Sequence, residues 1–439
     1  MSSLSALTEL HHYILADGLP IAFDARRSHG PYFVDAKTGE SYLDLFSFFA
    51  TQPIGFNHPK LNTAEFREKL GSLAIHRPSL SDVYTEDYAR AIASFAKLAG
   101  DSSFQHFFFV EGGALGNENA MKAAFDWKVR KNLAAGRGEK GSQIIHLKHA
   151  FHGRTGYTLS LTNTADPKKH MYFPKFSWPR ISSPALRFPV TEEIRLETQQ
   201  LEAQSLSEIR QALEVSPHDI AALIIEPIQA EGGDRHFRPE YLQALRHLAD
   251  ENEFLLIFDE VQTGLGLTGS MWAFQQLGVT PDLVSFGKKA QVGGCISGKR
   301  IDEVADNVFR LSSRINSTWG SNLIDLLRME RYLEIIVEDK LIDNVQKVGT
   351  YWLEALQAWA KEDALISNVR GRGLMIAFDC PSAQFRDRLR ERMFAHHVIV
   401  LGCGEKSIRL RPHLDITRDV VDVAMKAFKE AAHEVSRNE

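Results

Sequence analysis

The sequence predicts an α/β protein in which a large domain with a mostly parallel central sheet is joined to a smaller α+β domain. Two observations lead to this prediction. In the middle of the chain, short apolar runs alternate with longer amphipathic segments, the pattern of parallel βαβ units. In the last hundred or so residues, two long helical segments precede several short strands. A chain of 439 residues is too long for one ordinary core.

The large domain is predicted from its apolar runs, taken in chain order. We expect strands at 107–110, 144–147, 221–225, 254–258 and 283–286, and helices at 119–131 and 239–250. The stretch Pro174–Pro189 is rich in proline and is predicted to be a long surface loop. Sheets of this kind bind ligands beyond the carboxyl ends of their strands. The residues that follow each apolar run are therefore the candidates for chemistry.

The C-terminal part has a different pattern. We expect helices at 323–338, 341–356 and 420–435, and strands of a smaller sheet at 366–370, 373–379, 398–401 and 407–411. The predicted division of the chain is an N-terminal segment, 1–65, that joins the small domain, a large domain, 66–322, and a small domain, 323–439.

Composition narrows the class of protein. Hydrophobic residues make up 44% of the chain and charged residues 24%, the balance of a globular protein. The net charge of −5 and the absence of a dense basic run argue against nucleic-acid binding. No apolar run is long enough to span a bilayer, and the N-terminus does not resemble a signal peptide. Three separated cysteines predict a reducing, cytoplasmic setting.

The strongest chemical signal is Asp259, at the end of a very apolar strand. A carboxylate there is costly to bury without a partner, although a helix cap or a structural ion pair would also explain it. The next strand, 283–286, is followed by Lys288 and Lys289. A lysine in a cleft beside a buried carboxylate can form a Schiff base, whereas two lysines at a strand end are more often a solvated corner. The residues alone leave both interpretations open.

A glycine-rich segment, 111–119, lies between a predicted strand and the following helix. Small residues at a helix N-terminus can hold a phosphate, but an ordinary tight turn has the same composition. A second segment, Gly264–Gly269, spells G-x-G-x-x-G, and Asp282 follows near the distance of a ribose-binding acid. We reject a dinucleotide site because Asp259 and Glu260 would repel a pyrophosphate and no helix opens after Gly269.

Other polar residues are ambiguous when each is read alone. His146, His149 and His152 are evenly spaced, but they begin in a predicted strand and would not share a face, so we predict no metal site. Arg154 and Arg409 could each grip a carboxylate through two parallel hydrogen bonds. Glu231 and its neighbours could face a cleft or form a solvated acidic loop.

The order of these motifs resembles the class III (ω-) aminotransferases, which are pyridoxal-phosphate (PLP) enzymes of fold type I. The resemblance runs from Tyr42-Leu43-Asp44 to Arg409-Leu410-Arg411-Pro412. The family shows Asp-Glu-Val-Gln-Thr-Gly, then Pro-Asp, then the lysine that carries the cofactor. Asp259–Gly264 and Pro281–Lys288 follow that pattern without a gap, which selects Lys288 over Lys289. Lys289 departs from the small residue usual at its position.

The resemblance also implies roles for residues. Lys288 would carry PLP and move protons, and Asp259 would keep the pyridine nitrogen protonated. The other implied cofactor contacts are Val261 and Phe151 on the two ring faces, Gln262 at the ring hydroxyl, and Gly113 and Ala114 at the phosphate. Thr318, in the segment Asn316–Gly320, would reach the phosphate of a neighbouring subunit. Such shared sites imply a homodimer.

The resemblance further implies a substrate class. Arg409 would be neutralised by Glu231 while the donor binds and freed for 2-oxoglutarate, Arg154 would take the distal carboxylate, and Asn316 would contact substrate. Four segments are most similar to members that act on L-lysine: Leu45–Phe49, Phe286–Val292, Asn316–Gly320 and Arg370–Met375.

The expected reaction is therefore one of lysine catabolism. The terminal amine of L-lysine goes to 2-oxoglutarate, giving L-glutamate and 2-aminoadipate 6-semialdehyde, which cyclises to piperideine-6-carboxylate. Ornithine or 4-aminobutyrate as the donor is the alternative that the residues leave open. More distant alternatives are an NAD-dependent dehydrogenase, which would use Gly264–Gly269, and a non-catalytic relative that keeps the fold.

Overall fold

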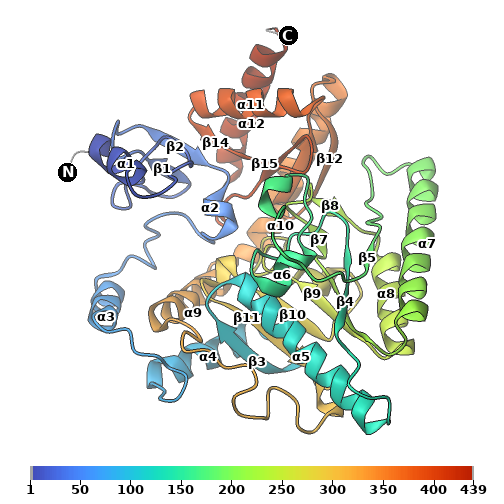
Figure 1. Cartoon of the computed structure of the whole chain (residues 1–439). Helices are drawn as coiled ribbons and strands as arrows, with labels where there is room; N and C mark the ends of the chain where they lie inside the picture. Colours follow the sequence, from blue (N-terminus) through green and yellow to red (C-terminus); the bar gives the residue numbers. More distant parts are fainter. Residues whose placement is uncertain (1–2, 438–439) are drawn as a thin grey trace.

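A seven-stranded sheet forms the centre of the computed structural model, which describes residues 3–437 (Figure 1). Its strands lie in the order β3-β11-β10-β9-β6-β4-β5. They are β3 (Phe104–Val110), β4 (Gln143–Leu147), β5 (Arg180–Ile181), β6 (Ile220–Ile225), β9 (Leu255–Asp259), β10 (Leu283–Phe286) and β11 (Gly293–Gly298). The strands from β10 to β5 run parallel, and β11 is antiparallel to both of its neighbours. The predicted mostly parallel sheet is confirmed.

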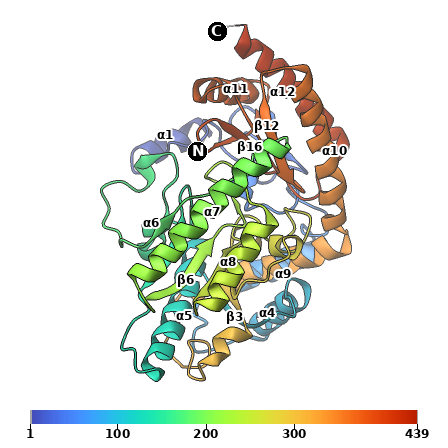
Figure 2. The ribbon, with the colours of Figure 1, turned by 90° about the vertical axis from the view of Figure 1, so that its right-hand side faces the viewer.

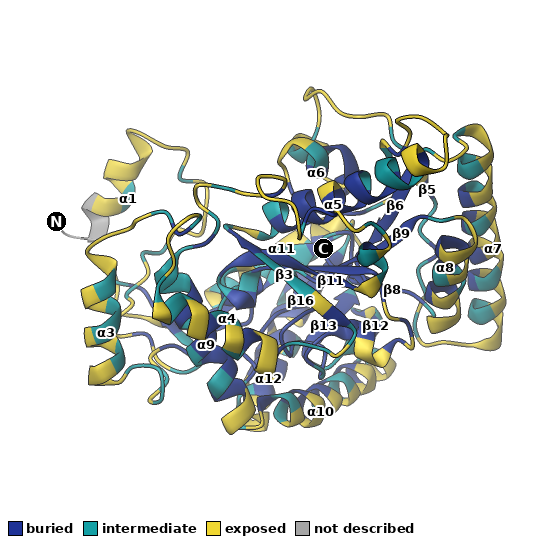
Figure 3. Cartoon of the chain, turned by 90° about the horizontal axis from the view of Figure 1, so that it is seen from below, coloured by how far each residue is buried: buried dark blue, intermediate teal, exposed yellow. Residues whose placement is uncertain are grey.

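Different helices cover the two faces of this sheet. Alternate residues of β6 separate the two cores: Ala222 and Ile224 pack with α5 (Gly113–Ala134), and Leu223 and Ile225 pack with α8 (Pro239–Glu251). Figure 2 shows α8 beside α7 (Glu192–Val215) on one side of the sheet. Figure 3 shows the strands buried and the outer turns of these helices exposed. Burial on both faces explains why the strands read as continuous apolar runs.

Shorter elements complete this part of the chain. They are α3 (Ala64–Ala74), α4 (Glu86–Leu98), α6 (Gly156–Leu161), the hairpin of β7 (Ile228–Gln229) and β8 (Arg235–His236), and the 3-10 turns η1 (Pro167–Lys169), η2 (Ala273–Gln276), η3 (Lys288–Ala290) and η4 (Lys299–Glu303).

The C-terminal part forms an antiparallel sheet in the order β12-β13-β16-β15. Its strands are β12 (Ser367–Arg372), β13 (Met375–Asp379), β15 (Leu401–Cys403) and β16 (Ser407–Leu410), and its helices are α9 (Leu323–Glu338), α10 (Leu341–Glu362), α11 (Ala383–Ala395) and α12 (Arg418–Ser436). The start of the chain supplies α1 (Ser3–His11), α2 (Ser47–Ala50), β1 (Tyr32–Val34) and β2 (Ser41–Asp44). The strand β14 (Val398–Ile399) pairs with β2 and ties the two ends of the chain together.

The structure corrects two predictions. The predicted strand 398–401 is two strands in different sheets, because the chain leaves β2 after Ile399 and pairs with β16 from Leu401. The predicted loop 174–189 contains β5, which extends the central sheet beside β4. Ile181 is buried there, but two residues are too few to show a period in the sequence.

Two further elements differ from what periodicity suggests. Strand β11 has the sequence Gly-Gly-Cys-Ile-Ser-Gly and gives no apolar alternation. Its glycines are needed for close approach, because a Cβ on Gly294 would lie 2.1 Å from the carbonyl oxygen of Phe108. Helix α5 begins at Gly113, six residues before its predicted start at Asn119. The buried residues of its first turns include the polar Asn117, Glu118 and Asn119, so the sequence there shows no amphipathic pattern. No helix within residues 3–437 has the length and apolar character to cross a membrane.

Candidate active site

A cavity of about 1240 Å³ opens at the carboxyl ends of the parallel strands. Residues that follow β3, β4, β6, β9 and β10 line one wall, which is where such sheets bind ligands. The other wall comes from the N-terminal segment and from 399–411. The cavity therefore lies between the central sheet and the parts that the two chain ends contribute.

Asp259, the last residue of β9, projects into this cavity from a buried position. Its Oδ2 atom lies 2.7 Å from Nδ2 of Asn117 and 2.7 Å from Nδ1 of His152. Its Oδ1 atom accepts a hydrogen bond of 3.0 Å from the backbone N–H of Val261. Ser285 on the adjacent strand donates to Oδ1 of Asn117 and fixes that amide in turn. The carboxylate is held on both oxygens.

Asn117 and His152 are site residues that motif reading alone did not assign. Asn117 lies one helical turn after Gly113, so it shares the face of α5 that looks onto β9 and β10. Its Nδ2 also donates to the carbonyl of His152. His152 was considered above only as a metal ligand. Its place after β4, at the same edge of the sheet as Asp259, was the feature of the sequence that could have indicated its role in the site.

Lys288 and Lys289 have different surroundings. Lys288 lines the cavity, whereas Lys289 is buried on the other side of η3, with Nζ 3.4 Å from the carbonyl oxygen of Gln262. Burial, reinforced by Arg409 and Arg411, lowers the pKa of Lys288 to about 8. Lys288 also has a left-handed backbone, with φ of 51°. Of the two lysines, only Lys288 presents an amine to the cavity.

The N-terminus of α5 forms a close cradle beside this lysine. A Cβ on Gly113 would lie 2.6 Å from Cγ1 of Val261, and a Cβ on Gly287 would lie 2.9 Å from Cα of Gly113. Gly112, the N-cap, has φ of 92°. Gly113 and Ala114 border the cavity. Unpaired backbone N–H groups at a helix N-terminus attract an anion such as a phosphate.

The remaining ring-contact candidates lie around the same space. Phe151, Val261 and Gln262 all line the cavity. Oε1 of Gln262 accepts a hydrogen bond of 2.8 Å from Nε of Arg411. The amide nitrogen of Gln262 is therefore the atom that can donate to another group. Arg154 is exposed at the cavity rim, with its guanidinium carbon 5.9 Å from the centre of the Phe151 ring.

Arg409 and Glu231 form an ion pair inside the cavity, with Nη2 and Oε2 2.7 Å apart. Arg409 comes from β16 and Glu231 from the loop after β7. Lys169 of η1 binds the other oxygen of Glu231. Burial acts to raise the pKa of Glu231, but Arg409 and Lys169 outweigh it and the pKa is lowered. The nearby Arg411 has its own partner, Asp234, at 2.9 Å.

A second buried acid, Glu226, borders the cavity behind Phe151. Its Oε1 accepts a hydrogen bond of 2.9 Å from the N–H of Phe151, and its Oε2 one of 3.1 Å from the N–H of Ala230. Burial raises the pKa of Glu226 to about 7; Asp259 adds to the increase and His152 opposes it. Glu226 thus links the loop of Phe151 to the loop of Glu231.

Asn316 and Thr318 do not line the cavity of their own chain. Both are exposed, Oδ1 of Asn316 accepts a hydrogen bond from the N–H of Ser317, and the carbonyl of Thr318 accepts one of 2.7 Å from Oγ of Ser79. The predicted role of Thr318 concerns a neighbouring subunit and that of Asn316 concerns the substrate, and both stay predictions.

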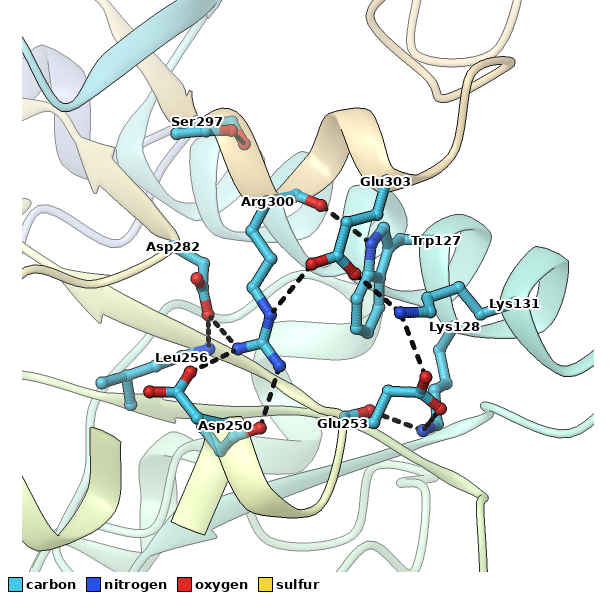
Figure 4. A network of polar contacts seen from close by, with 12 residues as sticks. Trp127, Lys128, Lys131, Asp250, Glu253, Leu256, Asp282, Ser297, Arg300 and Glu303 are labelled. Atoms are coloured by element: carbon cyan, nitrogen blue, oxygen red, sulfur yellow. Dashed lines mark hydrogen bonds and ion pairs between the residues drawn. The ribbon is translucent and has the colours of Figure 1, made fainter. Parts of the chain in front are cut away.

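The G-x-G-x-x-G segment has a structural role. Glu260 accepts hydrogen bonds from the N–H groups of Ala273 and Phe274, at 2.7 and 2.8 Å, and so joins the residues before the loop 264–269 to those after it. Asp282 lies at the opposite end of β10 from the cavity, where its Oδ2 accepts from Leu256 N at 2.7 Å and Arg300 Nη1 at 3.3 Å (Figure 4). Asp282 therefore anchors an ion-pair network at the amino ends of the strands.

Comparison with known proteins gives one consistent family. The family model for class III aminotransferases matches residues 14–432. L-lysine-epsilon aminotransferases from Mycobacterium tuberculosis and Streptomyces clavuligerus are 50% and 46% identical to the chain. The alignments cover 95% and 98% of this chain, and 93% and 94% of those proteins. The solved structure of a lysine aminotransferase from M. tuberculosis in the internal aldimine form has a TM-score of 0.96 at 49% identity, over 99% of this chain and 100% of that one.

Proposed function

The chain belongs to the class III aminotransferases, and we propose that it transfers the terminal amine of L-lysine to 2-oxoglutarate. The products are L-glutamate and 2-aminoadipate 6-semialdehyde, which cyclises to piperideine-6-carboxylate. The observation that carries the proposal is the ion pair between Arg409 and Glu231 in the cavity that Lys288 also lines. Identities of 46–50% with lysine aminotransferases over nearly the whole chain support lysine as the donor.

The cofactor is pyridoxal 5′-phosphate, and the cavity fits it. A glycine cradle at the start of α5, too close to Val261 for a Cβ at Gly113, suits a phosphate. Asp259 is a buried carboxylate fixed on both oxygens. PLP supplies an aldehyde that captures amines and a ring that withdraws electrons from the substrate carbon. We propose that Gly113 and Ala114 hold its phosphate and that Phe151 and Val261 cover the two ring faces.

The polar residues would then divide the work as follows. Asp259 keeps the ring nitrogen protonated, because a fixed buried anion favours a cation beside it. Gln262 donates its amide N–H to the ring hydroxyl, since Arg411 occupies its oxygen. Lys288 binds the cofactor. Its Nζ atom also accepts a proton from one carbon atom and donates it to another. A pKa of about 8 leaves a useful share of this amine neutral, as a base must be.

Arg409 and Glu231 would act as a gate for the two substrates. While Glu231 neutralises Arg409, this arginine cannot bind a carboxylate beside the reacting carbon of a substrate. The site then accepts a terminal amine, which has no such carboxylate. When Glu231 turns away, Arg409 can bind the carboxylate beside the keto group of 2-oxoglutarate through two hydrogen bonds. We propose that Arg154, at the rim, binds the distal carboxylate.

We further propose a homodimer in which Asn316 and Thr318 of each chain serve the site of the other. Their exposure outside their own cavity supports this arrangement. The division 1–65, 66–322 and 323–439 is supported by the pairing of β14 with β2. Three buried free cysteines support a reducing, cytoplasmic compartment.

A donor panel tests the function. The purified enzyme with PLP and 2-oxoglutarate is given L-lysine, L-ornithine or 4-aminobutyrate, and glutamate formation is measured together with the cyclic imine. Lysine should give the highest kcat/KM and the six-membered imine. If ornithine or 4-aminobutyrate supports glutamate formation and lysine does not, the proposed donor is wrong although the family assignment stands.

A further inference from the structure

The gate contains a third charged residue, Lys169. Nζ of Lys169 binds Oε1 of Glu231, and Nη2 of Arg409 binds Oε2 of the same carboxylate at 2.7 Å. All three side chains border the cavity. One anion is thus shared by two cations, each of which holds a separate oxygen.

We propose that Lys169 is a positioning residue that holds Glu231 when Arg409 binds the dicarboxylate substrate. This inference rests on the proposed function of Arg409 and Glu231 as a gate. In the closed state Glu231 bridges both cations, which is the state of this structure. In the open state Glu231 keeps Lys169 as its partner and leaves Arg409 to 2-oxoglutarate.

Charge balance is the reason why a third residue is needed. Arg409 and Glu231 alone sum to zero, so a carboxylate that binds Arg409 would leave Glu231 without the partner that neutralises it here, in a largely buried place. Glu231 has only 20% of its side chain exposed, and Arg409 has 6%. An unpaired charge in such surroundings is costly. With Lys169 the three groups sum to plus one, and the carboxylate of the substrate brings the set to zero. Arg411 does not alter this count because Asp234 pairs with it.

The position of Lys169 lets it act independently of Arg409. Lys169 lies on η1, which Asp166 caps by accepting a hydrogen bond of 3.1 Å from the N–H of Lys168. Arg409 lies on β16 of the C-terminal sheet. A movement of the arginine therefore does not have to carry the lysine with it. A lysine ammonium is a compact charge on a flexible stem, so it can follow a carboxylate that shifts.

The closed state also gains less from Lys169 than the open state does. In the closed state the two cations repel each other across the shared carboxylate. In the open state each cation has an anion of its own. Lys169 therefore stabilises the open state more than the closed state, and its loss should weaken binding of dicarboxylates.

The test uses the PLP-loaded enzyme with Lys169→Gln and the control Lys168→Gln, which removes an exposed charge from the neighbouring residue. Calorimetry measures the affinity for glutarate, a dicarboxylate without a keto group. Stopped-flow absorbance of the cofactor measures each half-reaction separately. Lys169→Gln should weaken glutarate binding about tenfold, the scale of one partly buried charge-assisted contact. It should also lower the rate with 2-oxoglutarate relative to the rate with L-lysine, Lys169→Arg should restore both, and Lys168→Gln should change neither.

A double-mutant cycle with Glu231→Gln separates the explanations. If Lys169 acts by holding Glu231, its substitution should have little effect once Glu231 carries no charge. An equal loss of glutarate affinity in both backgrounds would mean that Lys169 binds the dicarboxylate directly, and it would overturn the inference. A wild-type glutarate affinity in Lys169→Gln would also overturn it. Failure of the gate itself is recognised separately, because Glu231→Gln would then leave the preference between the two substrates unchanged.

Discussion

Nδ1 of His152 lies 2.7 Å from Oδ2 of Asp259, and both side chains are buried. The same oxygen accepts from Asn117, and the other oxygen accepts from the backbone at Val261. A carboxylate fixed in this way needs no reorganisation when charge develops beside it. The orientation of Asp259 is thus set by residues from α5 and from the loop after β4.

Asp259→Asn should lower kcat by about 10²–10³-fold, the scale of losing one preorganised electrostatic group. The affinity for PLP should fall much less, because the phosphate cradle and Lys288 are unchanged. Steady-state kinetics and a fluorescence titration with PLP measure the two effects. Asp282→Asn is the matched control: it removes a buried acid at the other end of the sheet, so it should lower stability and leave turnover of the folded enzyme near wild type. A larger loss of PLP affinity than of kcat in Asp259→Asn would contradict the assigned role.

Borohydride reduction of the PLP enzyme should label Lys288 and leave Lys289 unlabelled. Lys288 presents its amine to the cavity, whereas the amine of Lys289 lies against the carbonyl of Gln262. Peptide mapping by mass spectrometry identifies the labelled residue. Lys288→Ala should abolish labelling, and the control Lys289→Met should keep it. Label on Lys289 in the wild type would reverse the choice.

Glu226 should make stability depend on pH between about 4.5 and 7. Its pKa is raised to about 7 in the folded protein, chiefly by burial, so the contribution of this group is fully present below 4.5 and is lost as the pH rises through 7. The neighbouring titratable groups are His152 and Asp259. Glu226→Gln removes this dependence and costs a constant amount for an altered hydrogen bond. The Tm of the variant minus that of the wild type should therefore increase from pH 5 to pH 8, as measured by calorimetry. A difference that stays constant or falls would show that Glu226 is not protonated in the folded protein.

Mixed dimers should reveal the shared site. Thr318→Ala alone should raise the Kd for PLP, and Lys288→Ala alone should be inactive. A dimer with one chain of each variant has one site that carries both substitutions and one that carries neither. Mixing the two proteins under conditions that exchange subunits, at a PLP concentration too low to load Thr318→Ala, should therefore raise activity to about a quarter of the wild-type value, because statistical exchange makes half of the dimers mixed and half of their sites intact. No gain over the unmixed variants would argue against a shared site.

The sequence predicted the structure best where a single physical rule determines where an element or a side chain lies. Four of the five parallel strands, β4, β6, β9 and β10, were predicted because burial on both faces requires continuous apolar runs, whereas β5 lies in a predicted loop. Asp259 was singled out because it ends a very apolar strand, and Lys288 was preferred to Lys289 because its spacing matches the family pattern. Strand β11 was not predicted, because its glycines serve contact with β3 and α5, and such contacts leave no periodic signal. Asn117 and Lys169 needed the structure, since each meets a partner on a segment far away in the sequence.

The contact between Gly113 and Gly287 limits how this enzyme can change during evolution. The two backbones touch with no room for a side chain between them. Substitution cannot adjust the spacing between the helix that faces the phosphate and the strand end that carries the lysine. Variation in donor preference can instead arise on the opposite wall, which Leu19, Ile21 and Phe48 line. A library aimed at new amines should therefore keep both glycines and diversify that wall.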